Sequence, residues 1–195
     1  MEFQIKKLTN DQIDKLVLDS KLSMNSLSIS IPYSYVIELV DLNWNDILFA
    51  IENGFLLQDS AIEHAIIEIE KNEKYSQAVF DLACLSPTQT IDKESIFLNI
   101  KKLANLISED LKRQSKDKIM YVLLNWVFEH RDHYSDPFRV VEIIYDDFSF
   151  PAAISSFVRY LPSDQTDLDS VDSNKEKLYK NWKKYLDKQA VFWKK

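Results

Sequence analysis

Residues 120–162 read MYVLLNWVFEHRDHYSDPFRVVEIIYDDFSFPAAISSFVRYLP, and this stretch decides the fold. It opens with large apolar side chains at helical spacing, namely Met120, Leu123, Leu124 and Val127. Asp136-Pro137 then marks a second helix, because aspartate caps a helix and proline at the first helical position lacks only an N–H that had no partner. Phe150-Pro151 predicts a third start, and Pro162 closes the stretch. The pattern predicts consecutive helices separated by short turns.

The same spacing of apolar residues recurs upstream. We expect inward-facing stripes at Tyr33, Val36, Ile37 and Val40, at Ile47, Ala50 and Ile51, at Ile62, Ala65, Ile66 and Ile69, and at Val79, Leu82 and Ala83. Asn43 is predicted to cap one of these helices with Asp46 in its first turn, and Asp59 to cap the next. Asn53-Gly54 supplies a left-handed stop between the two. The short connection predicts an antiparallel pair.

Two further segments complete the helical pattern. Thr9 or Asn10 can cap a first helix near the start of the chain. A long helix is predicted to begin at Asp92, with apolar residues at steps of three and four: Ile96, Ile100, Leu103, Ile107 and Leu111. Residues 112–118 are strongly charged and predict a break, with Ser115 as a cap, where the chain could subdivide.

The fold class follows from these stripes and from a single glycine in 195 residues. So little glycine disfavours phosphate-binding loops and tight hairpins. Residues 22–31 alternate as a strand does, but no second strand is available, so we expect an extended connector. The sequence predicts an all-α, single-domain bundle of about eight or nine helices. Its body spans residues 1–162, an acidic linker spans 163–174, and a lysine-rich helix spans 175–195 and docks on the body.

Composition limits the function. There are 24 Lys and Arg against 31 Asp and Glu, a net charge of −7. This balance disfavours binding to nucleic acid, which needs a basic surface, and is compatible with a basic protein partner. The chain lacks an apolar leader and any apolar run long enough to span a bilayer, so we expect a cytoplasmic protein without membrane contact. Cys84 is the only cysteine, which excludes an internal disulfide.

Few residues point to catalysis. His130 and His133 are three residues apart, with Glu129, Asp132 and Asp136 nearby, and two histidines with a carboxylate could bind a metal ion. A metal-dependent hydrolase could use these histidines together with Asp146 and Asp147. The alternative is a basic helix end that suits the negative pole of the helix dipole. His64 borders an apolar stripe, which is more typical of packing than of catalysis. We therefore predict no catalytic residue, no metal site and no cofactor.

An acidic and aromatic turn is the best candidate for recognition. It contains acids interleaved with aromatic rings, followed by a basic and aromatic pair: Glu142, Tyr145, Asp146, Asp147, Phe148, Arg159 and Tyr160. Such a surface would suit a basic protein. The structural alternative is an acidic helix end paired with Arg139 or Arg159. The lysine-rich helix is expected to dock through Leu178, Trp182, Tyr185 and Leu186.

Several motifs resemble the bacterial domain-of-unknown-function family 2247. They are LNWNDI at 42–47, IENGFL at 51–56, AIEHA at 61–65, WVFEHR at 126–131, Asp136-Pro137, IYDDF at 144–148 and FVRYLP at 157–162. The resemblance covers residues 31–162 and brings no catalytic residue with it. Members look like small acidic proteins encoded among bacterial toxin loci, so the resemblance implies an immunity role.

These observations lead to one functional prediction and two alternatives. The prediction is a non-enzymatic immunity protein that occludes a cognate bacterial toxin, such as a basic nuclease. The first alternative is a metal-dependent helical hydrolase built on the two histidines and the acidic turn. The second is an adaptor whose terminal helix binds an unknown partner.

Overall fold

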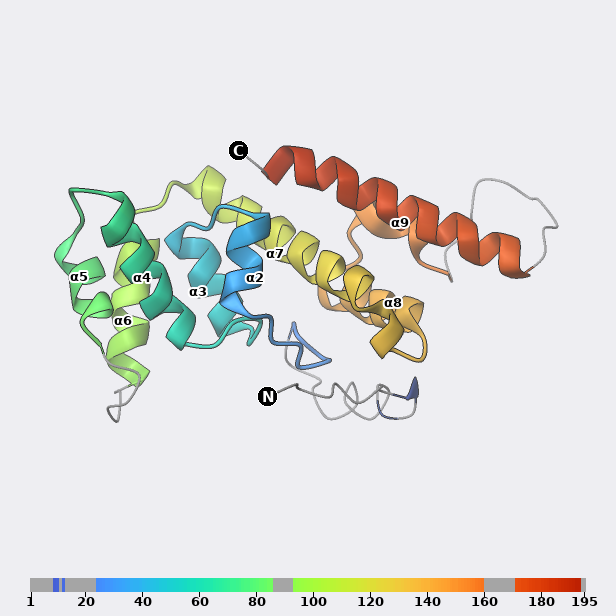
Figure 1. Ribbon diagram of the computed structural model, residues 1–195, viewed down its shortest axis with the longest axis horizontal. Helices are drawn as coiled ribbons and strands as arrows, with labels where there is room; N and C mark the ends of the chain where they lie inside the picture. The colour runs from blue at the N-terminus through green and yellow to red at the C-terminus, as the bar shows by residue number, and fades with distance from the viewer. Residues whose placement is uncertain (1–8, 11, 13–23, 86–92, 160–170, 194–195) are drawn as a thin grey trace. The chain divides into compact units, whose positions relative to one another are not determined.

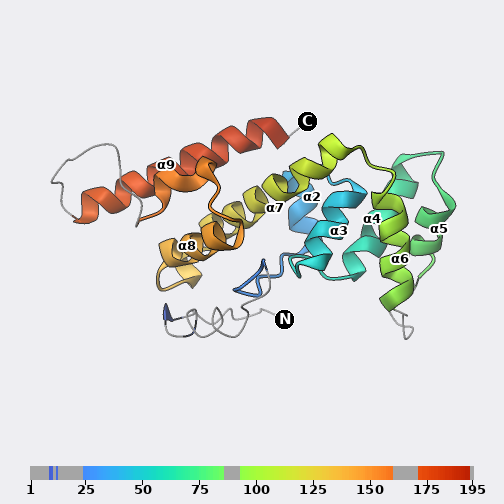
Figure 2. The same cartoon turned by 180° about the vertical axis from the view of Figure 1, so that it is seen from behind.

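The computed structural model describes residues 9–10, 12, 24–85, 93–159 and 171–193. These residues form helices and no strand, which confirms the all-α prediction. The chain divides into two compact units. Of the described residues, unit 1 contains 9–10, 12, 24–28, 120–159 and 171–193, and unit 2 contains 29–85 and 93–119. Figures 1 and 2 show the helices from opposite sides. In the described part of the chain, no helix is both long and apolar enough to cross a bilayer.

Unit 2 contains most of the helices: α2 (Tyr33–Leu39), α3 (Trp44–Glu52), α4 (Asp59–Lys71), α5 (Gln77–Ala83), α6 (Lys93–Ala104) and the first half of α7 (Glu109–Glu129). Helix α4 packs on α5, and α6 packs on both α5 and α3 (Figure 1). The extended connector predicted at residues 22–31 is only partly present among the described residues, because residues 25–28 form a turn in which the Ser28 N–H donates to the Asn25 carbonyl at 2.9 Å. Residues 29–31 have no regular structure, and the Ile31 N–H donates to the Phe55 carbonyl at 2.9 Å.

The predicted ends of α3 are confirmed. Asn43 caps the helix, and its side chain accepts hydrogen bonds from the N–H groups of Asn45 and Asp46. The Asp46 carboxylate in turn accepts from the Asn43 N–H at 2.9 Å, which completes a capping box. Gly54 follows the helix with φ of 73°, a left-handed conformation that costs glycine almost nothing.

Three inward-facing predictions were wrong. Leu111 is 43% exposed and lies on α7, not on the helix predicted to begin at Asp92, and the other two residues are isoleucines. Ile37 on α2 and Ile66 on α4 are 39% and 41% exposed, whereas their predicted neighbours Val36 and Ala65 are buried. The prediction that Asp59 caps α4 was also wrong, because Gln58 occupies the cap and Asp59 is the first helical residue. An acid in the first turn still favours the positive end of the helix dipole.

The predicted break at residues 112–118 was wrong. Helix α6 ends at Ala104, a short turn follows, and α7 runs through the charged segment without interruption. Ser115 and Lys118 lie within α7 and are buried. Their polarity reflects a buried carboxylate that they bind, as described below. Residues 92 and 161–170, which include the predicted helix start and most of the predicted linker, lie outside the described residues.

Unit 1 contains the second half of α7, the 3-10 helix η1 (Arg131–His133), α8 (Pro137–Asp147), the 3-10 helix η2 (Ala152–Phe157) and α9 (Val171–Trp193). Every α7 residue from Met120 to Leu124 is buried, so this stretch of the helix is enclosed on all sides. Phe150-Pro151 was predicted to start an α-helix, but the segment that follows is the 3-10 helix η2. Helix α9 packs along η2 (Figures 1 and 2), and Trp182 is fully buried among aromatic rings.

Candidate functional site

An ion-pair network joins α8 to the segment after η2. The Arg159 guanidinium donates two hydrogen bonds to Glu142, from Nε to Oε1 at 2.8 Å and from Nη2 to Oε2 at 3.1 Å. Its Nη1 donates to Asp136 Oδ2 at 2.7 Å. Asp136 is also the cap of α8, as predicted, and Arg139 approaches Glu142 at 3.7 Å. The predicted pairing of the acidic turn with Arg139 or Arg159 is therefore confirmed for Glu142.

The first role of this network is structural. Glu142 is only 6% exposed, and a buried carboxylate is costly unless a cation and hydrogen bonds compensate it. The hydrogen bond to Glu142 is the main reason that the pKa of Arg159 is raised above its ordinary value. The bidentate contact fixes the chain after η2 against α8.

The end of α8 is held by a second contact. Asp147 accepts hydrogen bonds from the Ser26 N–H at 2.9 Å and from the Ser26 hydroxyl at 2.5 Å. Burial raises the pKa of Asp147, and the two bonds from Ser26 lower it again in part. The carboxylate thereby connects α8 to residues 24–28, which lie far away in the sequence but in the same unit.

Helix α8 ends in two left-handed residues that are not glycine. Ser149 has φ of 66° and Phe150 has φ of 59°, and the Phe150 N–H donates to the Tyr145 carbonyl at 2.9 Å. This conformation costs roughly 1–2 kcal/mol for a residue with a side chain. We call residues 145–150 the α8 corner. Phe150, the last residue of this corner, is 62% exposed and gives the corner an exposed aromatic ring.

The predicted recognition residues have different environments. Glu142, Tyr145 and Phe148 are buried at 6%, 7% and 2% exposure, and Tyr160 lies outside the described residues. Asp146 is exposed, Asp147 is half-buried, and the Arg159 side chain is 40% exposed beside its two carboxylates. A partner could therefore reach Asp146 and the edge of Arg159 at this corner. Their role in recognition stays a prediction.

The histidines stack and do not converge on a common point. The His130 ring lies 3.8 Å from the Trp126 ring and 5.7 Å from the His133 ring, and both pairs are stacked. His130 Nδ1 is hydrogen-bonded to the Trp126 carbonyl at 2.8 Å, a contact within α7. Among the described residues, no group of three or more His, Cys, Asp or Glu side chains could hold a metal ion.

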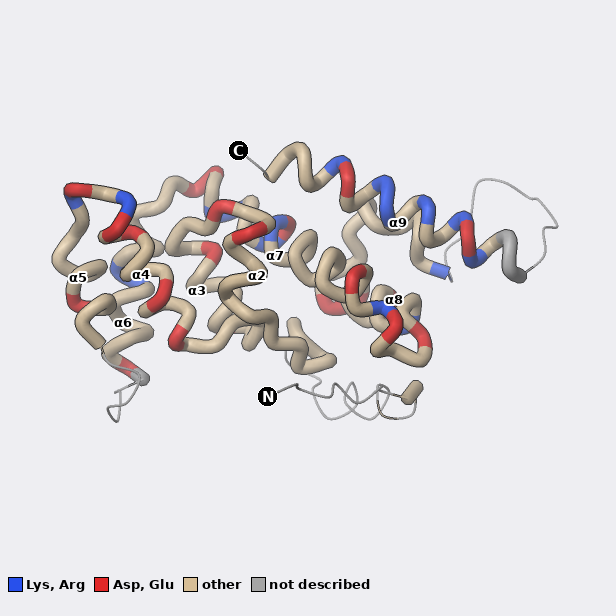
Figure 3. Tube along the Cα trace, viewed as in Figure 1, with Lys and Arg blue, Asp and Glu red and all other residues tan. Residues whose placement is uncertain are grey.

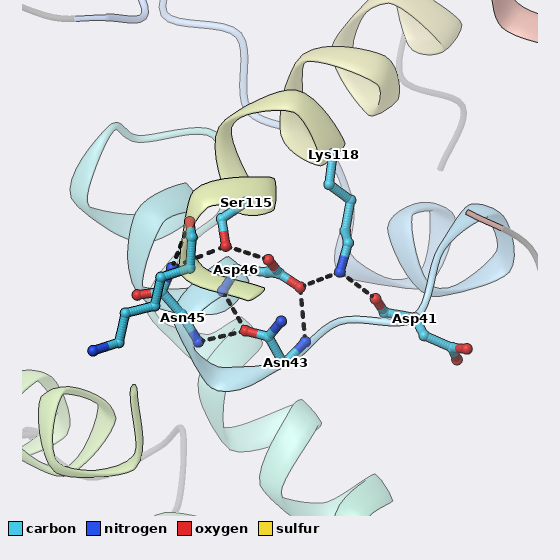
Figure 4. Close-up of polar contacts among 7 residues, drawn as sticks. Asp41, Asn43, Asn45, Asp46, Ser115 and Lys118 are labelled. Carbon is cyan, nitrogen blue, oxygen red and sulfur yellow. Dashed lines mark hydrogen bonds and ion pairs between the residues drawn. The ribbon is translucent and has the colours of Figure 1, made fainter. Parts of the chain in front are cut away.

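A buried polar cluster in unit 2 was not predicted (Figure 4). Asp46 is fully buried, and the Lys118 ammonium donates to its Oδ2 at 2.5 Å. Lys118 also donates to the Asp41 carbonyl at 2.9 Å, and its side chain is only 9% exposed. The same Asp46 oxygen accepts from Asn43 in the capping box. One carboxylate therefore caps α3 and neutralises a cation from α7.

Serine and asparagine side chains complete this cluster (Figure 4). The Ser115 hydroxyl donates to Asp46 Oδ1, and Asn45 Nδ2 donates to Ser115 Oγ at 2.9 Å. Ser115 is 1% exposed, so this hydroxyl is closed to an incoming substrate. We call Asp46 with Asn43, Asn45, Ser115 and Lys118 the Asp46 cluster. Its geometry fixes α3 to α7 and provides no access for chemistry.

His64 is held in an aromatic environment in unit 2. Its Nδ1 is hydrogen-bonded to the Tyr33 hydroxyl at 2.8 Å, and its ring packs edge-on against Trp44 at 4.8 Å. Burial, with a smaller contribution from Lys71, lowers the pKa of His64 to about 4. Burial also raises the pKa of Tyr33. The imidazole is therefore neutral at pH 7, and its contacts agree with the packing role predicted for it.

Negative charge is concentrated in one part of unit 2 (Figure 3). Residues 29–85 contain ten acids against only two lysines, Lys71 and Lys74. The acids are Glu38, Asp41, Asp46, Glu52, Asp59, Glu63, Glu68, Glu70, Glu73 and Asp81. All are exposed except Asp46 and Glu68. The net charge gave no hint of this distribution, because the lysines of α6, α7 and α9 offset it.

Comparison with known proteins adds one finding. The model of the family described as "Uncharacterized protein conserved in bacteria (DUF2247)" matches residues 33–190. The match includes the motifs on which the resemblance was noted and extends into α9. No curated protein and no solved structure matches the chain.

Proposed function

This chain belongs to the DUF2247 family of uncharacterized bacterial proteins, and from that premise we propose that it binds and neutralises a basic protein, as an immunity protein does its toxin. The observation that supports the proposal most strongly is the set of eight exposed acids against two lysines within residues 29–85, an excess of six negative charges. Such a concentration steers a basic partner and rejects an acidic one. The role proposed is one of occlusion and requires no catalysis by this chain.

The chemistry of the partner follows from the sign of this charge. A toxin that cleaves nucleic acid must carry a basic surface to hold phosphates. An acidic protein that covers this surface blocks the substrate by charge and by volume. A basic nuclease domain is therefore the partner class that the charge favours.

Two surfaces could carry the contact. The first, which we call the unit 2 face, is the surface of α2 to α5 that carries the exposed acids, where Ile37 and Ile66 are also exposed. The second is the α8 corner, where Asp146 and Phe150 face outward. Each combines charge with an exposed apolar side chain, and apolar contacts supply most of the energy at protein interfaces. The unit 2 face has the larger charge, so we assign the main contact to it.

The decisive experiment mixes the purified protein with the product of the adjacent gene. Calorimetry should detect binding, and nuclease activity should fall in proportion to the complex formed. The double substitution Glu63→Lys with Glu70→Lys should weaken binding about tenfold or more, because it turns attraction into repulsion on α4. Asp146→Lys tests the α8 corner in the same assay.

A matched control has the same change in charge elsewhere. Glu176→Lys with Asp187→Lys alters two exposed acids on α9, outside both surfaces, and should change affinity much less than the α4 pair. No binding to the adjacent gene product or to any basic nuclease from the same locus would refute the proposal. Equal losses in both double variants would refute its assignment to α4.

A further inference from the structure

Helix α9 uses only one face to pack on its own unit. Trp182 is fully buried and stacks on Phe157 with ring centroids 5.9 Å apart, and it meets Phe128 edge-on at 5.1 Å. Tyr185 and Leu186 are buried on the same face at 8% and 2% exposure. The helix is therefore docked through its aromatic face, and its opposite face is exposed.

A row of lysines lies on that outer face, and Figure 3 shows basic residues recurring along α9. Lys177, Lys180, Lys184 and Lys188 are all exposed and follow one another at steps of three, four and four residues. This spacing keeps them on one stripe of the helix. The row continues into Val191, which is 83% exposed, with Phe192 beside it at 66%. An exposed aliphatic and aromatic pair at the end of a cationic row is a feature of a docking surface.

A matching row lies on α4. Asp59, Glu63, Ile66 and Glu70 are all exposed and follow one another at steps of four, three and four residues. They also form one stripe, which borders the buried Ile62 and lies opposite the buried Ala61 and Ala65. Leu57, which precedes the row, is 66% exposed. This row therefore has three carboxylates along its length and an exposed apolar residue at one end.

The two rows match when the helices run antiparallel. Each row spans eleven residue steps, or roughly 16 Å along a helix. In that register Lys188 lies opposite Asp59, Lys184 opposite Glu63, and Lys177 opposite Glu70. The aliphatic stem of Lys180 covers Ile66, as long side chains commonly do on apolar surface. The exposed pair Val191 and Phe192 then reaches the exposed Leu57.

We propose that two copies of this chain associate through these rows, with the outer face of α9 from one copy docked antiparallel on α4 of the other. If both copies contribute both rows, the contacts are reciprocal and the assembly closes as a two-fold dimer. The inference goes beyond the proposed toxin binding and does not depend on it. It also gives the acidic row a second role, because the dimer would shield α4 until a basic partner displaces α9.

Charge and apolar matching favour a second copy over other occupants. A phosphate backbone would satisfy the lysine row alone, but the net charge of −7 would repel it and Val191 and Phe192 would gain nothing from it. An anionic bilayer could bind both the lysine row and the exposed pair Val191 and Phe192, but it would leave the acidic row of α4 without a role. A second copy accounts for both rows, their equal length and their apolar ends.

Sedimentation velocity of the full chain tests the proposal directly. The protein should sediment as a monomer and dimer in an equilibrium that depends on concentration. Dimer formation should weaken as salt rises from about 0.01 M to about 1 M, over which the Debye length falls from about 30 Å to about 3 Å. A monomer at every concentration and salt would overturn the proposal.

Charge reversal makes the test specific. Lys180→Glu with Lys184→Glu should weaken the dimer about tenfold or more, and so should Glu63→Lys with Glu70→Lys. A mixture of the two variants should regain a dimer, because the reversed α9 of one then faces the reversed α4 of the other. Lys101→Glu with Lys102→Glu, on the exposed face of α6, is the matched control and should leave the dimer unchanged.

Three results would count against this contact. They are a dimer that both row variants leave intact, a mixture that fails to reassociate, and a monomer whose lysine row binds anionic vesicles or nucleic acid. Circular dichroism melting of each variant shows that it is folded, and the neutral pair Glu63→Gln with Glu70→Gln should give a smaller loss of the same sign. Since no toxin is present, these outcomes are separate from the test of the proposed function.

Discussion

The Asp46 cluster in unit 2 and the Glu142–Arg159 network in unit 1 handle a buried carboxylate in different ways. Both carboxylates are nearly inaccessible, at 0% and 6% exposure. The cation that meets Asp46 is itself buried, because the Lys118 side chain is only 9% exposed. The cation that meets Glu142 is partly in water, because the Arg159 side chain is 40% exposed.

This difference shows which charges the fold depends on. A buried pair is expensive to desolvate, and removal of one partner leaves the other charge without compensation. A pair at the surface can exchange its partner for water at little cost. Unit 2 should therefore tolerate the loss of its carboxylate poorly, whereas unit 1 should tolerate the loss of its arginine better.

The largest expected effect is the loss of Asp46. Asp46→Ala should lower the free energy of unfolding by about 3–5 kcal/mol, because Lys118 keeps a buried charge and α3 loses half of its capping box. Urea denaturation followed by circular dichroism measures this value. Adding Lys118→Met should restore part of the stability, since the stranded charge is removed. A double variant as unstable as Asp46→Ala alone would contradict the role assigned to the ion pair.

Acid should expose a second weakness of unit 2. His64 has a folded pKa of about 4, below the ordinary 6.5, so the unfolded chain binds the proton more tightly in this range. Its contribution to stability is complete above pH 6.5 and is lost as the pH falls toward 4, by up to about 3 kcal/mol. His64→Asn should flatten this part of the stability profile. A profile of the same slope in both proteins would assign the acid sensitivity to other groups.

The loss of Arg159 should cost less. Arg159→Ala should lower stability by about 1–2 kcal/mol, because Glu142 loses a bidentate partner but keeps Arg139 nearby and gains access to water. Arg159→Lys should recover little, since an ammonium cannot reproduce the fork of the guanidinium. Urea denaturation under the same conditions gives the comparison. A loss larger than that of Asp46→Ala would reverse the contrast between the two units.

The smallest effects concern the two left-handed corners. Ser149→Gly should stabilise the protein by about 1 kcal/mol, because glycine adopts the positive φ of this position without strain. Gly54→Ala, at the corresponding position after α3, should destabilise it by about 1–2 kcal/mol. Thermal melts measure both. Ser149→Gly without any gain would show that contacts of the serine side chain offset the strain.

Features of the fold were predicted correctly where they depend on residues close together in the sequence. The caps at Asn43 and Asp136 and the glycine stop at Gly54 were found because each acts on the next few residues. The pairing of the acidic turn with Arg159 was also predicted, because only a short segment separates them. Ile37 and Ile66 were wrongly predicted to be buried. Helical periodicity identifies the apolar stripe of a helix, but it does not say how much of that stripe the neighbouring helices cover.

By itself, then, the sequence determined an all-helical chain, the start and stop of α3, the start of α8, the acidic balance and the family. Only the tertiary structure decided that residues 112–118 continue a helix, because Lys118 and Ser115 meet a carboxylate about seventy positions earlier in the chain. It also decided which acids are exposed, such as Asp146, and which are buried in ion pairs that stabilise the fold, such as Glu142. Propensity and capping act within a few residues, whereas burial and ion pairing depend on which distant segments pack together.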